Sequence, residues 1–512
     1  LGMVTTKTLD GWIAENLEPS TAFSNQVKQT VKQICDFLKE DCFLPEIHVY
    51  KTVKGGSAGK GTALKNNSDA DVVLFLSSLK SYQQQKQKRK AMLDLIIGRL
   101  NACRENLQFN VDIDEPRYKG PGNTPRSLSL TLISKETRES IEVDILPAYD
   151  ALGQVKKDTP PNPEVYVELL KACSGPGEFS PCFTELQKLF VKHHPAKLKN
   201  FIRLVKYWYK EQALTCPFLS SPQCKLKYPE ADLPPKYALE LLTIYAWEEG
   251  TQSCDSFDMA RGFYTVLGLL CQHQDICIYW EKYYSLQHSQ IGAHIKKLLC
   301  RNRPVILDPA DPTGILGQGK DWGLMAQLAD RCCSSLPWLK NVTPWDVQPA
   351  RPVTIEVKQL CGHSLSMTVS PYTTITKVKE VIQQKWNISL YGQRLAQHEP
   401  GKSNIILQDG KTLAMHHIFY NTTLVLLQTE PQEMQVFVKD HKNQSITYTV
   451  LPTITVWQLK QQIQTRQGPP ADQQNLVYGS KNLENQHTLA HYNVQPLTTI
   501  HLHLRLRGGA GP

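Results

Sequence analysis

The chain has 512 residues, of which 41% are hydrophobic and 21% are charged, and these proportions exclude extended disorder. No apolar run reaches the roughly 18–20 residues that a membrane helix needs, so we predict no membrane span. The sequence opens without a signal-peptide pattern, and its 14 cysteines form no regular framework. We therefore expect reduced thiols in a cytoplasmic protein that can also enter the nucleus. The net charge of +9 is a weak argument for nucleic-acid binding.

At about 100–200 residues per domain, the length predicts three or four domains. The stretch from about 45 to 150 contains apolar, strand-like runs. From about 160 to 345, apolar residues recur at steps of three and four, which is typical of helices that bury one face. We therefore predict two lobes, one with a mixed sheet at 1–160 and one that is helical at 161–350.

Two short units of similar build follow, at 353–429 and 434–509. The opening strand 353–358 is echoed by 434–439, and the helical segment after it is echoed in the same way. Each unit therefore reads as strand, turn, strand, helix and further strands.

Residues 54–62, KGGSAGKGT, form a glycine-rich loop. It is not a Walker A loop, because that motif needs glycine five residues before the Gly59-Lys60 pair and serine or threonine directly after it. Lys54 and Gly61 occupy those two positions. A glycine-rich loop alone is a weak signal, since many such loops are only turns.

Three aspartates favour a functional role for this loop. Asp69 and Asp71 begin one apolar strand and share a face of it, and Asp144 lies in another. Neighbouring carboxylates repel and usually persist beside a cation. Three carboxylates can hold two Mg²⁺ ions for in-line phosphoryl transfer, with Ser57 and the loop amides around a triphosphate. A turn or a capped strand end is the alternative for the first two, but Gly56-Ser57 upstream favours the metal site.

These motifs resemble the Gly-Ser, Asp-x-Asp and Asp signature of template-independent nucleotidyltransferases, and more closely the vertebrate 2′-5′-oligoadenylate synthetases. The resemblance covers about 5–350 and implies a bilobal nucleotidyltransferase fold of the α+β class. The motifs that carry it are KGGSAGKGT at 54–62, DILPAYDALG at 144–153, YALELLTIYAWE at 237–248 and ILDPADP at 306–312.

The resemblance implies an enzyme that joins ATP into 2′-5′-linked oligoadenylates once double-stranded RNA binds, in antiviral innate immunity. It implies that Asp69, Asp71 and Asp144 are catalytic and ligate Mg²⁺. Lys236 stands where well-known active members have glutamine, which bears on base contact and not on the metal chemistry. The Cys-Phe-Lys motif through which some synthetases tetramerise is missing, so we expect a monomer. The ATP contacts implied are Gly56, Ser57, Lys60, Arg203, Lys206, Lys236 and Tyr237.

A lysine-rich segment is the candidate RNA site. Between residues 183 and 212, seven basic residues stand against two glutamates, a local net charge of +5. Lys188 and Lys192 are four residues apart and share a helix face, and duplex RNA is bound mainly through phosphates and 2′-hydroxyls. A solvated lysine face is the alternative. The resemblance implies an RNA-facing side made of Lys39, Lys54, Lys188, Lys192 and Lys197.

The unit at 434–509 looks like ubiquitin in its start, MQVFVK, its middle, DQQNLVY, and its LRGG ending. The unit at 353–429 is a more divergent relative, and two β-grasp, ubiquitin-like domains behind a synthetase resemble the oligoadenylate-synthetase-like subgroup. Because Ala510, Gly511 and Pro512 follow Gly508-Gly509, we favour a fused module that is not conjugated. The tandem implies protein partners.

Two functions stay open. The first is the enzyme, favoured by three intact aspartates, and the second is a catalytically silent double-stranded-RNA sensor that signals through the ubiquitin-like tandem. The related cyclic-dinucleotide synthases are disfavoured, because we see no compact Cys/His cluster like their zinc site. Bulk charge does not decide, since residues 351–512 carry +6 of the net +9.

Overall fold

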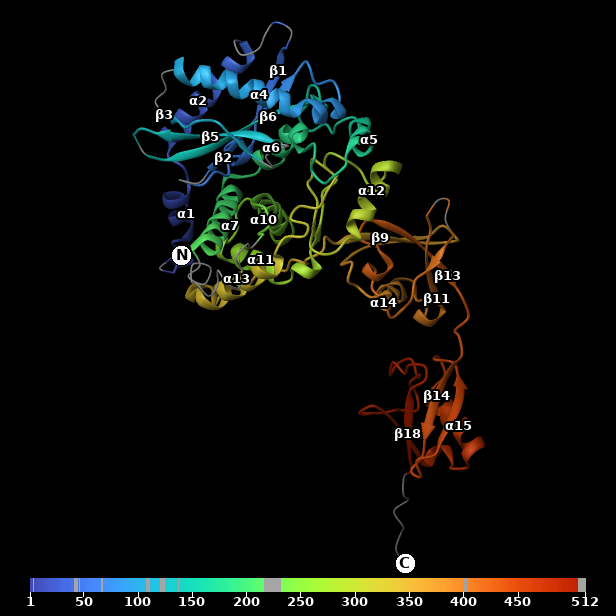
Figure 1. Cartoon of the computed structure of the whole chain (residues 1–512). Coiled ribbons are helices and arrows are strands. Elements are labelled where there is room, and N and C mark those ends of the chain that lie inside the picture. The colour runs from blue at the N-terminus through green and yellow to red at the C-terminus, as the bar shows by residue number, and fades with distance from the viewer. Residues whose placement is uncertain are drawn as a thin grey trace, which may run out of the picture. The chain divides into compact units, whose positions relative to one another are not determined.

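The computed structural model describes the chain except residues 3, 41–44, 46, 66–67, 107–110, 120–124, 137, 216–231, 400, 402 and 505–512. The chain divides into two compact units, Leu1–Arg351 and Pro352–Pro512, and each is described by itself (Figure 1). The predicted ending Gly508-Gly509 lies outside the described residues. Within the described ranges, no helix combines the length and the apolar character needed to cross a bilayer.

The first unit is built on a six-stranded sheet with the order β1-β2-β6-β5-β3, in which β4 also pairs with β5. Strands β2 and β6 run parallel, whereas β1 with β2 and β5 with β6 run antiparallel. The sheet is therefore mixed, with its one parallel pair near the middle. The strands are β1 Val49–Lys54, β2 Ser68–Leu76, β3 Val111–Ile113, β4 Arg117–Lys119, β5 Ser127–Ser134 and β6 Ser140–Ala148.

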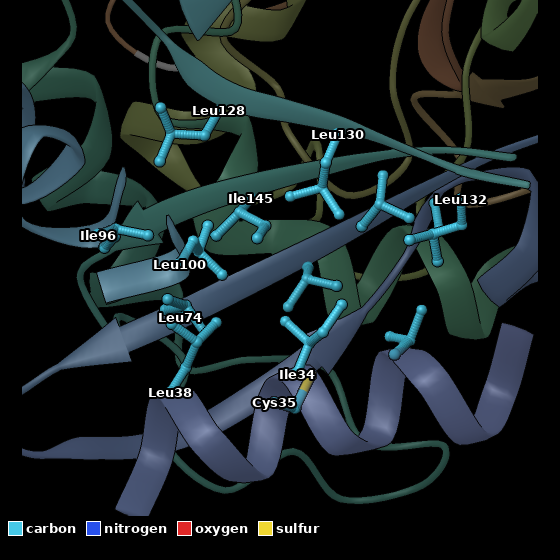
Figure 2. Packing of buried hydrophobic residues seen from close by; sticks show 14 of the residues in the cluster. Ile34, Cys35, Leu38, Leu74, Ile96, Leu100, Leu128, Leu130, Leu132 and Ile145 are labelled. Atoms are coloured by element: carbon cyan, nitrogen blue, oxygen red, sulfur yellow. The ribbon is translucent and has the colours of Figure 1, made fainter. Parts of the chain in front are cut away.

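One face of this sheet carries the hydrophobic core of the lobe. Apolar side chains of α2 (Thr21–Glu40) and α4 (Tyr82–Asn106) share one cluster with those of β2, β5 and β6. Figure 2 shows Ile34 of α2 below Leu74 and Ile145 of the strands. Because side chains alternate along a strand, the residues between these core positions point to the opposite face of the sheet.

Helices make up most of the rest of the first unit. The central one, α10, contacts α7 and α11, and every residue from Ala238 to Trp247 is buried. A helix that is apolar all round is typical of such a position, so the buried Glu240 within it needs a compensating charge. The helices are α1 Leu9–Leu17, α5 Pro163–Ala172, α6 Thr184–Lys192, α7 Ala196–Thr215, α10 Lys236–Thr251, α11 Met259–Cys271, α12 Ser289–Leu299 and α13 Trp322–Ser335.

The second unit contains two five-stranded sheets with equivalent strand orders, β10-β9-β13-β11-β12 and β15-β14-β18-β16-β17. In each sheet, the strand that comes first in the chain pairs in parallel with the strand that comes last, β9 with β13 and β14 with β18. One helix packs its apolar side on each sheet. The first sheet and its helix are β9 Val353–Gln359, β10 Ser364–Val369, α14 Ile375–Trp386, β11 Gln393–Gln397, β12 Ile405–Ile406 and β13 Thr422–Gln428. The second are β14 Met434–Lys439, β15 Ser445–Val450, α15 Val456–Gln467, β16 Gln474–Tyr478, β17 Lys481–Asn482 and β18 Thr499–Leu504.

Candidate active site

The glycine-rich loop lies directly against the strand that carries two of the aspartates. It folds into the short helix α3 (Gly56–Lys60), and Gly55 and Asp71 exchange backbone hydrogen bonds of 2.7 and 3.3 Å. Gly56 has a φ of +69°, and a Cβ there would lie 2.9 Å from the Cα of Ala70 and from the carbonyl oxygen of Asp69. Glycine at position 56 thus permits both the left-handed backbone and the close approach of loop to strand.

Ser57 holds the first aspartate in place. Its Oγ donates to Oδ1 of Asp69 at 2.6 Å and accepts from the backbone N–H of Asp69 at 3.0 Å. The Ser57 residue is buried, at 3% exposure, whereas Asp69 is exposed. In this arrangement, Ser57 therefore orients the carboxylate of Asp69.

The parallel pairing of β2 and β6 places the aspartates on the face of the sheet opposite the core formed with α2 and α4. Asp71 is the register partner of Asp144, and Asp69 is the partner of Glu142. Burial, followed by the charges of Asp69 and Asp144, raises the pKa of Asp71 to about 6. Such crowding of carboxylates is stable only where a positive charge is close.

A lysine from a neighbouring strand supplies positive charge to this group. The Nζ of Lys119 lies 2.8 Å from Oδ2 of Asp144 and 3.2 Å from Oε1 of Glu142, which also accepts from Ser129 Oγ at 2.8 Å. The other carboxylate oxygen of Asp144, Oδ1, is buried and has no hydrogen-bond partner.

These residues fit a magnesium site in their chemistry. Mg²⁺ prefers carboxylate oxygens, and the unpartnered Oδ1 of Asp144 is a buried acceptor with nothing else to bind. In the described part of the chain, no three His, Cys, Asp or Glu side chains are already gathered as a metal-binding group. The donor set is therefore suitable, while Asp69 is bound by Ser57 and one oxygen of Asp144 by Lys119.

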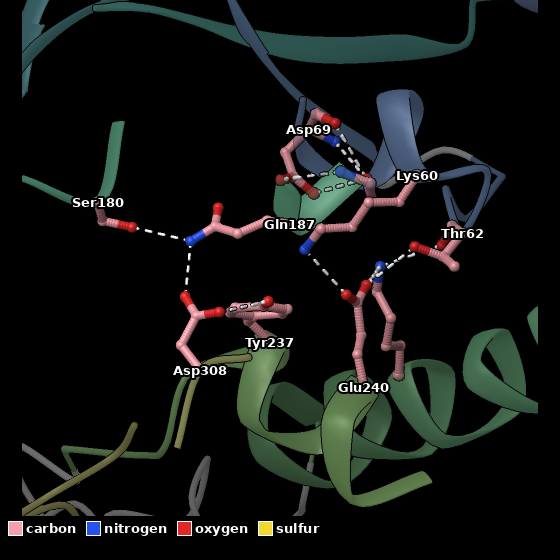
Figure 3. A network of polar contacts seen from close by, with 10 residues as sticks. Lys60, Thr62, Asp69, Ser180, Gln187, Tyr237, Glu240 and Asp308 are labelled. Carbon is pink, nitrogen blue, oxygen red and sulfur yellow. Dashed lines mark hydrogen bonds and ion pairs between the residues drawn. The ribbon is translucent and has the colours of Figure 1, made fainter. Parts of the chain in front are cut away.

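The lysine of the loop belongs to a buried charge cluster with α7 and α10. Nζ of Lys60 and Nζ of Lys206 each lie 3.0 Å from one oxygen of Glu240, and Thr62 Oγ1 donates to the same carboxylate at 2.9 Å (Figure 3). Burial alone would raise the pKa of Glu240, but the two lysines outweigh it and lower the pKa to about 2. Two ammonium groups share one carboxylate, which leaves one positive charge beside the loop.

Tyr237 connects this charge cluster with a second buried carboxylate. Nζ of Lys60 lies 3.8 Å from the centre of the Tyr237 ring, whose hydroxyl donates to Oδ1 of Asp308 at 3.0 Å. Gln187 donates to the other oxygen of Asp308 at 2.7 Å (Figure 3). Burial, and then the charge of Asp311, raises the pKa of Asp308 to about 6. The ring of Tyr237 is therefore held at both its face and its edge.

Two further predicted ATP contacts are Arg203 and Lys236. The guanidinium of Arg203 donates to the carbonyl oxygens of Gly61 at 2.7 Å and Ala63 at 2.8 Å, so it braces the end of the loop. Lys236 begins α10, and burial lowers its pKa while the charge of Asp69 opposes that shift.

The predicted RNA lysines do not all fall in one cluster. Burial is the main cause that lowers the pKa of Lys188, and the charges of Lys192 and Lys54 add to it. Lys197 instead forms a 2.9 Å ion pair with Asp10. Lys39 is exposed in the last turn of α2. Lys188 and Lys192 belong to α6 and Lys54 ends β1, and α6 packs against both β1 and α3.

Several residues of the site were not assigned a role from the sequence. Glu240 and Asp308 stood inside motifs that carried the family resemblance, and Glu240, the one charged residue in the run 238–247, was a usable signal. Lys119, Glu142 and Gln187 gave no such signal, because their partners come from other strands and helices.

Three family models match parts of this chain. Residues 32–157 match the family model "Nucleotidyltransferase domain", residues 159–350 match "2′-5′-oligoadenylate synthetase 1, domain 2, C-terminus", and residues 436–507 match "Ubiquitin family".

Relatives match between 68% and 98% of this chain. The 2′-5′-oligoadenylate synthase-like protein 2 of Mus musculus is 40% identical over 506 residues, covering 96% of each chain. The 2′-5′-oligoadenylate synthase-like protein 1 of Rattus norvegicus is 39% identical over 98% of this chain and 96% of its own. The 2′-5′-oligoadenylate synthase 1A of Mus musculus is 42% identical over 68% of this chain and 94% of its own. The resemblance inferred from the motifs is confirmed: the chain belongs to the 2′-5′-oligoadenylate synthetase family and carries a nucleotidyltransferase domain followed by a ubiquitin domain.

Proposed function

We propose that this protein is an active 2′-5′-oligoadenylate synthetase that double-stranded RNA activates. The observation that carries the proposal is the register of β2 and β6, which sets Asp71 beside Asp144 and next to the loop that orients Asp69. Relatives named as synthases, such as the 1A protein of Mus musculus, support it. The reaction would join the 2′-hydroxyl oxygen of one nucleotide to the α-phosphorus of ATP, while the bond to pyrophosphate breaks.

In this reaction, Asp69, Asp71 and Asp144 would hold two Mg²⁺ ions. The ions, when bound, supply positive charge for the phosphates and favour ionisation of the attacking hydroxyl. Lys60 and Lys206 carry one charge more than Glu240 neutralises, which suits a triphosphate. Tyr237 offers an aromatic face to adenine.

The test is incubation of the full chain with ATP, Mg²⁺ and duplex RNA. We expect oligoadenylate that resists a 3′-5′-specific nuclease, formed only when RNA is present. Asp69→Ala should make none, whereas Asp36→Ala, which removes an exposed ion pair with Lys32 on α2, should match the parent. Equal rates with and without RNA would refute RNA activation. No product from the parent chain would leave the silent sensor as the remaining function.

For RNA, we propose that Lys54, Lys188 and Lys192 bind the duplex. α6 carries two of these lysines and packs against α3, and Lys188 also approaches Gly59, since a Cβ there would lie 3.9 Å from its Cδ. RNA bound on α6 would therefore press on the glycine-rich loop. A shift of the loop toward β2 would bias the aspartates toward their metal-binding arrangement, as a ligand-driven change of population.

Charge reversal of Lys188 and Lys192 to glutamate is expected to weaken duplex-RNA binding at least tenfold. Each phosphate contact that is lost means that fewer counterions are released on binding. The magnitude of the slope of log affinity against log salt concentration should therefore fall by roughly one per lysine. Fluorescence anisotropy at several salt concentrations measures both quantities. The control reverses Lys88 and Lys90, two exposed lysines of α4, and should keep the parent's slope. Equal losses in the two double variants would point to bulk charge.

We further propose that residues 353–429 are a second ubiquitin-like domain. The two C-terminal sheets have equivalent strand orders, and each helix buries a lysine whose Nζ reaches a polar loop residue. Lys379 pairs with Asp409, and Lys460 donates to Asn485 at 2.8 Å. A tandem of such domains would offer its surfaces to protein partners, which is how an RNA signal could be passed on without catalysis.

A further inference from the structure

The strand pairing lets Lys119 reach across one strand to an aspartate of the site. It is the last residue of β4, where it pairs with Ser127 of β5, and β5 in turn pairs with β6, which carries Asp144. Its ammonium group lies 2.8 Å from one oxygen of Asp144 and 3.2 Å from Glu142. A single lysine therefore contacts both acids that β6 presents to this face.

The Lys119–Asp144 pair is stronger than an ordinary surface contact. The side chain of Asp144 is only 18% exposed, so solvent and salt screen the attraction less than at a fully exposed pair. The side chain of Lys119 is 52% exposed, and its long stem leaves it free to turn toward solvent. The strand pairing holds Asp144 in the sheet, whereas the side chain of Lys119 can rotate toward solvent.

We infer that Lys119 is a built-in competitor of the metal ion at Asp144, an inference that rests on the proposed role of this residue as a metal ligand. An ammonium and a divalent cation repel each other, and here both would bind one carboxylate: Lys119 contacts Oδ2 of Asp144, and Oδ1 is the oxygen left for the metal. Metal binding therefore opposes the contact of Lys119 with Asp144, and the metal concentration that fills the site rises accordingly. Before metal binds, the same lysine reduces the repulsion among Asp69, Asp71, Glu142 and Asp144.

Competition predicts two effects of opposite sign, which a purely structural lysine would not produce. Lys119→Met should lower the melting temperature of the metal-free protein, because Asp144 and Glu142 lose the lysine that contacts them both. The same change should tighten Mn²⁺ binding about three- to tenfold, because the metal no longer opposes an ion pair. Lys119→Arg keeps the charge and should keep the affinity of the parent.

The experiment titrates the full chain with Mn²⁺ and follows the free ion by electron paramagnetic resonance. The matched control is Lys32→Met, which removes a 2.6 Å lysine–aspartate pair from the exposed side of α2 and should leave the Mn²⁺ affinity unchanged. An affinity in Lys119→Met that equals or falls below the parent's would overturn the inference.

Asp144→Asn separates this failure from a failure of the proposed function. If Asp144→Asn weakens Mn²⁺ binding, the carboxylates hold metal, and the Lys119 variants alone decide the inference. If Asp144→Asn and Asp71→Asn bind Mn²⁺ as the parent does, or if neither the parent nor Lys119→Met binds it, the aspartates are not the metal site. In that case both the proposed mechanism and the inference fall.

Discussion

Glu240→Gln is expected to lower the free energy of unfolding of the first unit by about 3–5 kcal/mol, because it leaves two buried ammonium groups without a counter-charge. Lys60 and Lys206 are only 8% and 2% exposed, and both direct their ammonium groups at this one carboxylate. Glutamine keeps the shape and can still accept from Thr62, so the loss isolates the charge. Urea denaturation followed by circular dichroism measures it.

The pH dependence of the stability tests the same contact of Glu240 with Lys60 and Lys206. The pKa of Glu240 is lowered from 4.5 to about 2, so its ionised form is favoured in the folded protein. A depressed pKa contributes stability above the unfolded value, and that contribution is lost as the pH falls through the folded value. The stability difference between parent and Glu240→Gln should therefore be full above about pH 4.5 and shrink toward pH 2.

An exposed glutamate is the control for Glu240. Glu168 pairs with Lys171 at 2.8 Å on the surface of α5, and Glu168→Gln should leave the unfolding curve unchanged. A Glu240→Gln protein as stable as the parent would mean that the two lysines reach solvent or another counter-charge.

Gly56→Ala is expected to reduce oligoadenylate synthesis about 100-fold, the loss typical of a displacement of roughly 1 Å among reacting groups. The new Cβ would lie 2.9 Å from the Cα of Ala70 and 3.0 Å from the amide nitrogen of Asp71. Both atoms belong to the backbone of β2, so the clash is relieved only by moving the strand that carries the aspartates. Initial rates at saturating RNA and Mg²⁺ give the result.

Gly153→Ala is a matched control for the backbone cost. Gly153 has a φ of +62°, close to the +69° of Gly56, but a Cβ there would meet no atom within 4 Å. Both variants bear the left-handed penalty of about 1 kcal/mol, and only Gly56→Ala adds the clash. Equal rates and equal melting temperatures in the two variants would mean that the loop yields without moving the strand.

The sequence was most informative where chemistry follows from local spacing. Alternation along an apolar strand puts Asp69 and Asp71 on one face, and Asp144 stands in a second apolar strand. The structure pairs Asp71 with Asp144 in the register of β2 and β6, and the family itself could be recognised from long motifs. The nucleotidyltransferase and ubiquitin parts are confirmed by the family models.

Long-range pairings were beyond the reach of local patterns. Glu240 contacts Lys60 although 180 positions of the chain separate them. Asp144 contacts Lys119 only because the short strand β4 pairs with β5, the strand next to β6. Arg203 was assigned to ATP, and its guanidinium binds the loop carbonyls of Gly61 and Ala63. No helix or strand periodicity encodes which buried charge will neutralise another, since that depends on tertiary packing.

The parallel register of β2 and β6 makes the spacing of Asp71 and Asp144 independent of the length of chain that joins them. Backbone hydrogen bonds set it, and the alternate residues locked in the core prevent the strands from slipping, because a slip of one residue would turn every side chain to the wrong face. Changes in the length of the loops within that connection therefore leave the two carboxylates in place, as long as α4 and β5 keep their packing. One residue added within either strand would bury an aspartate and expose a valine.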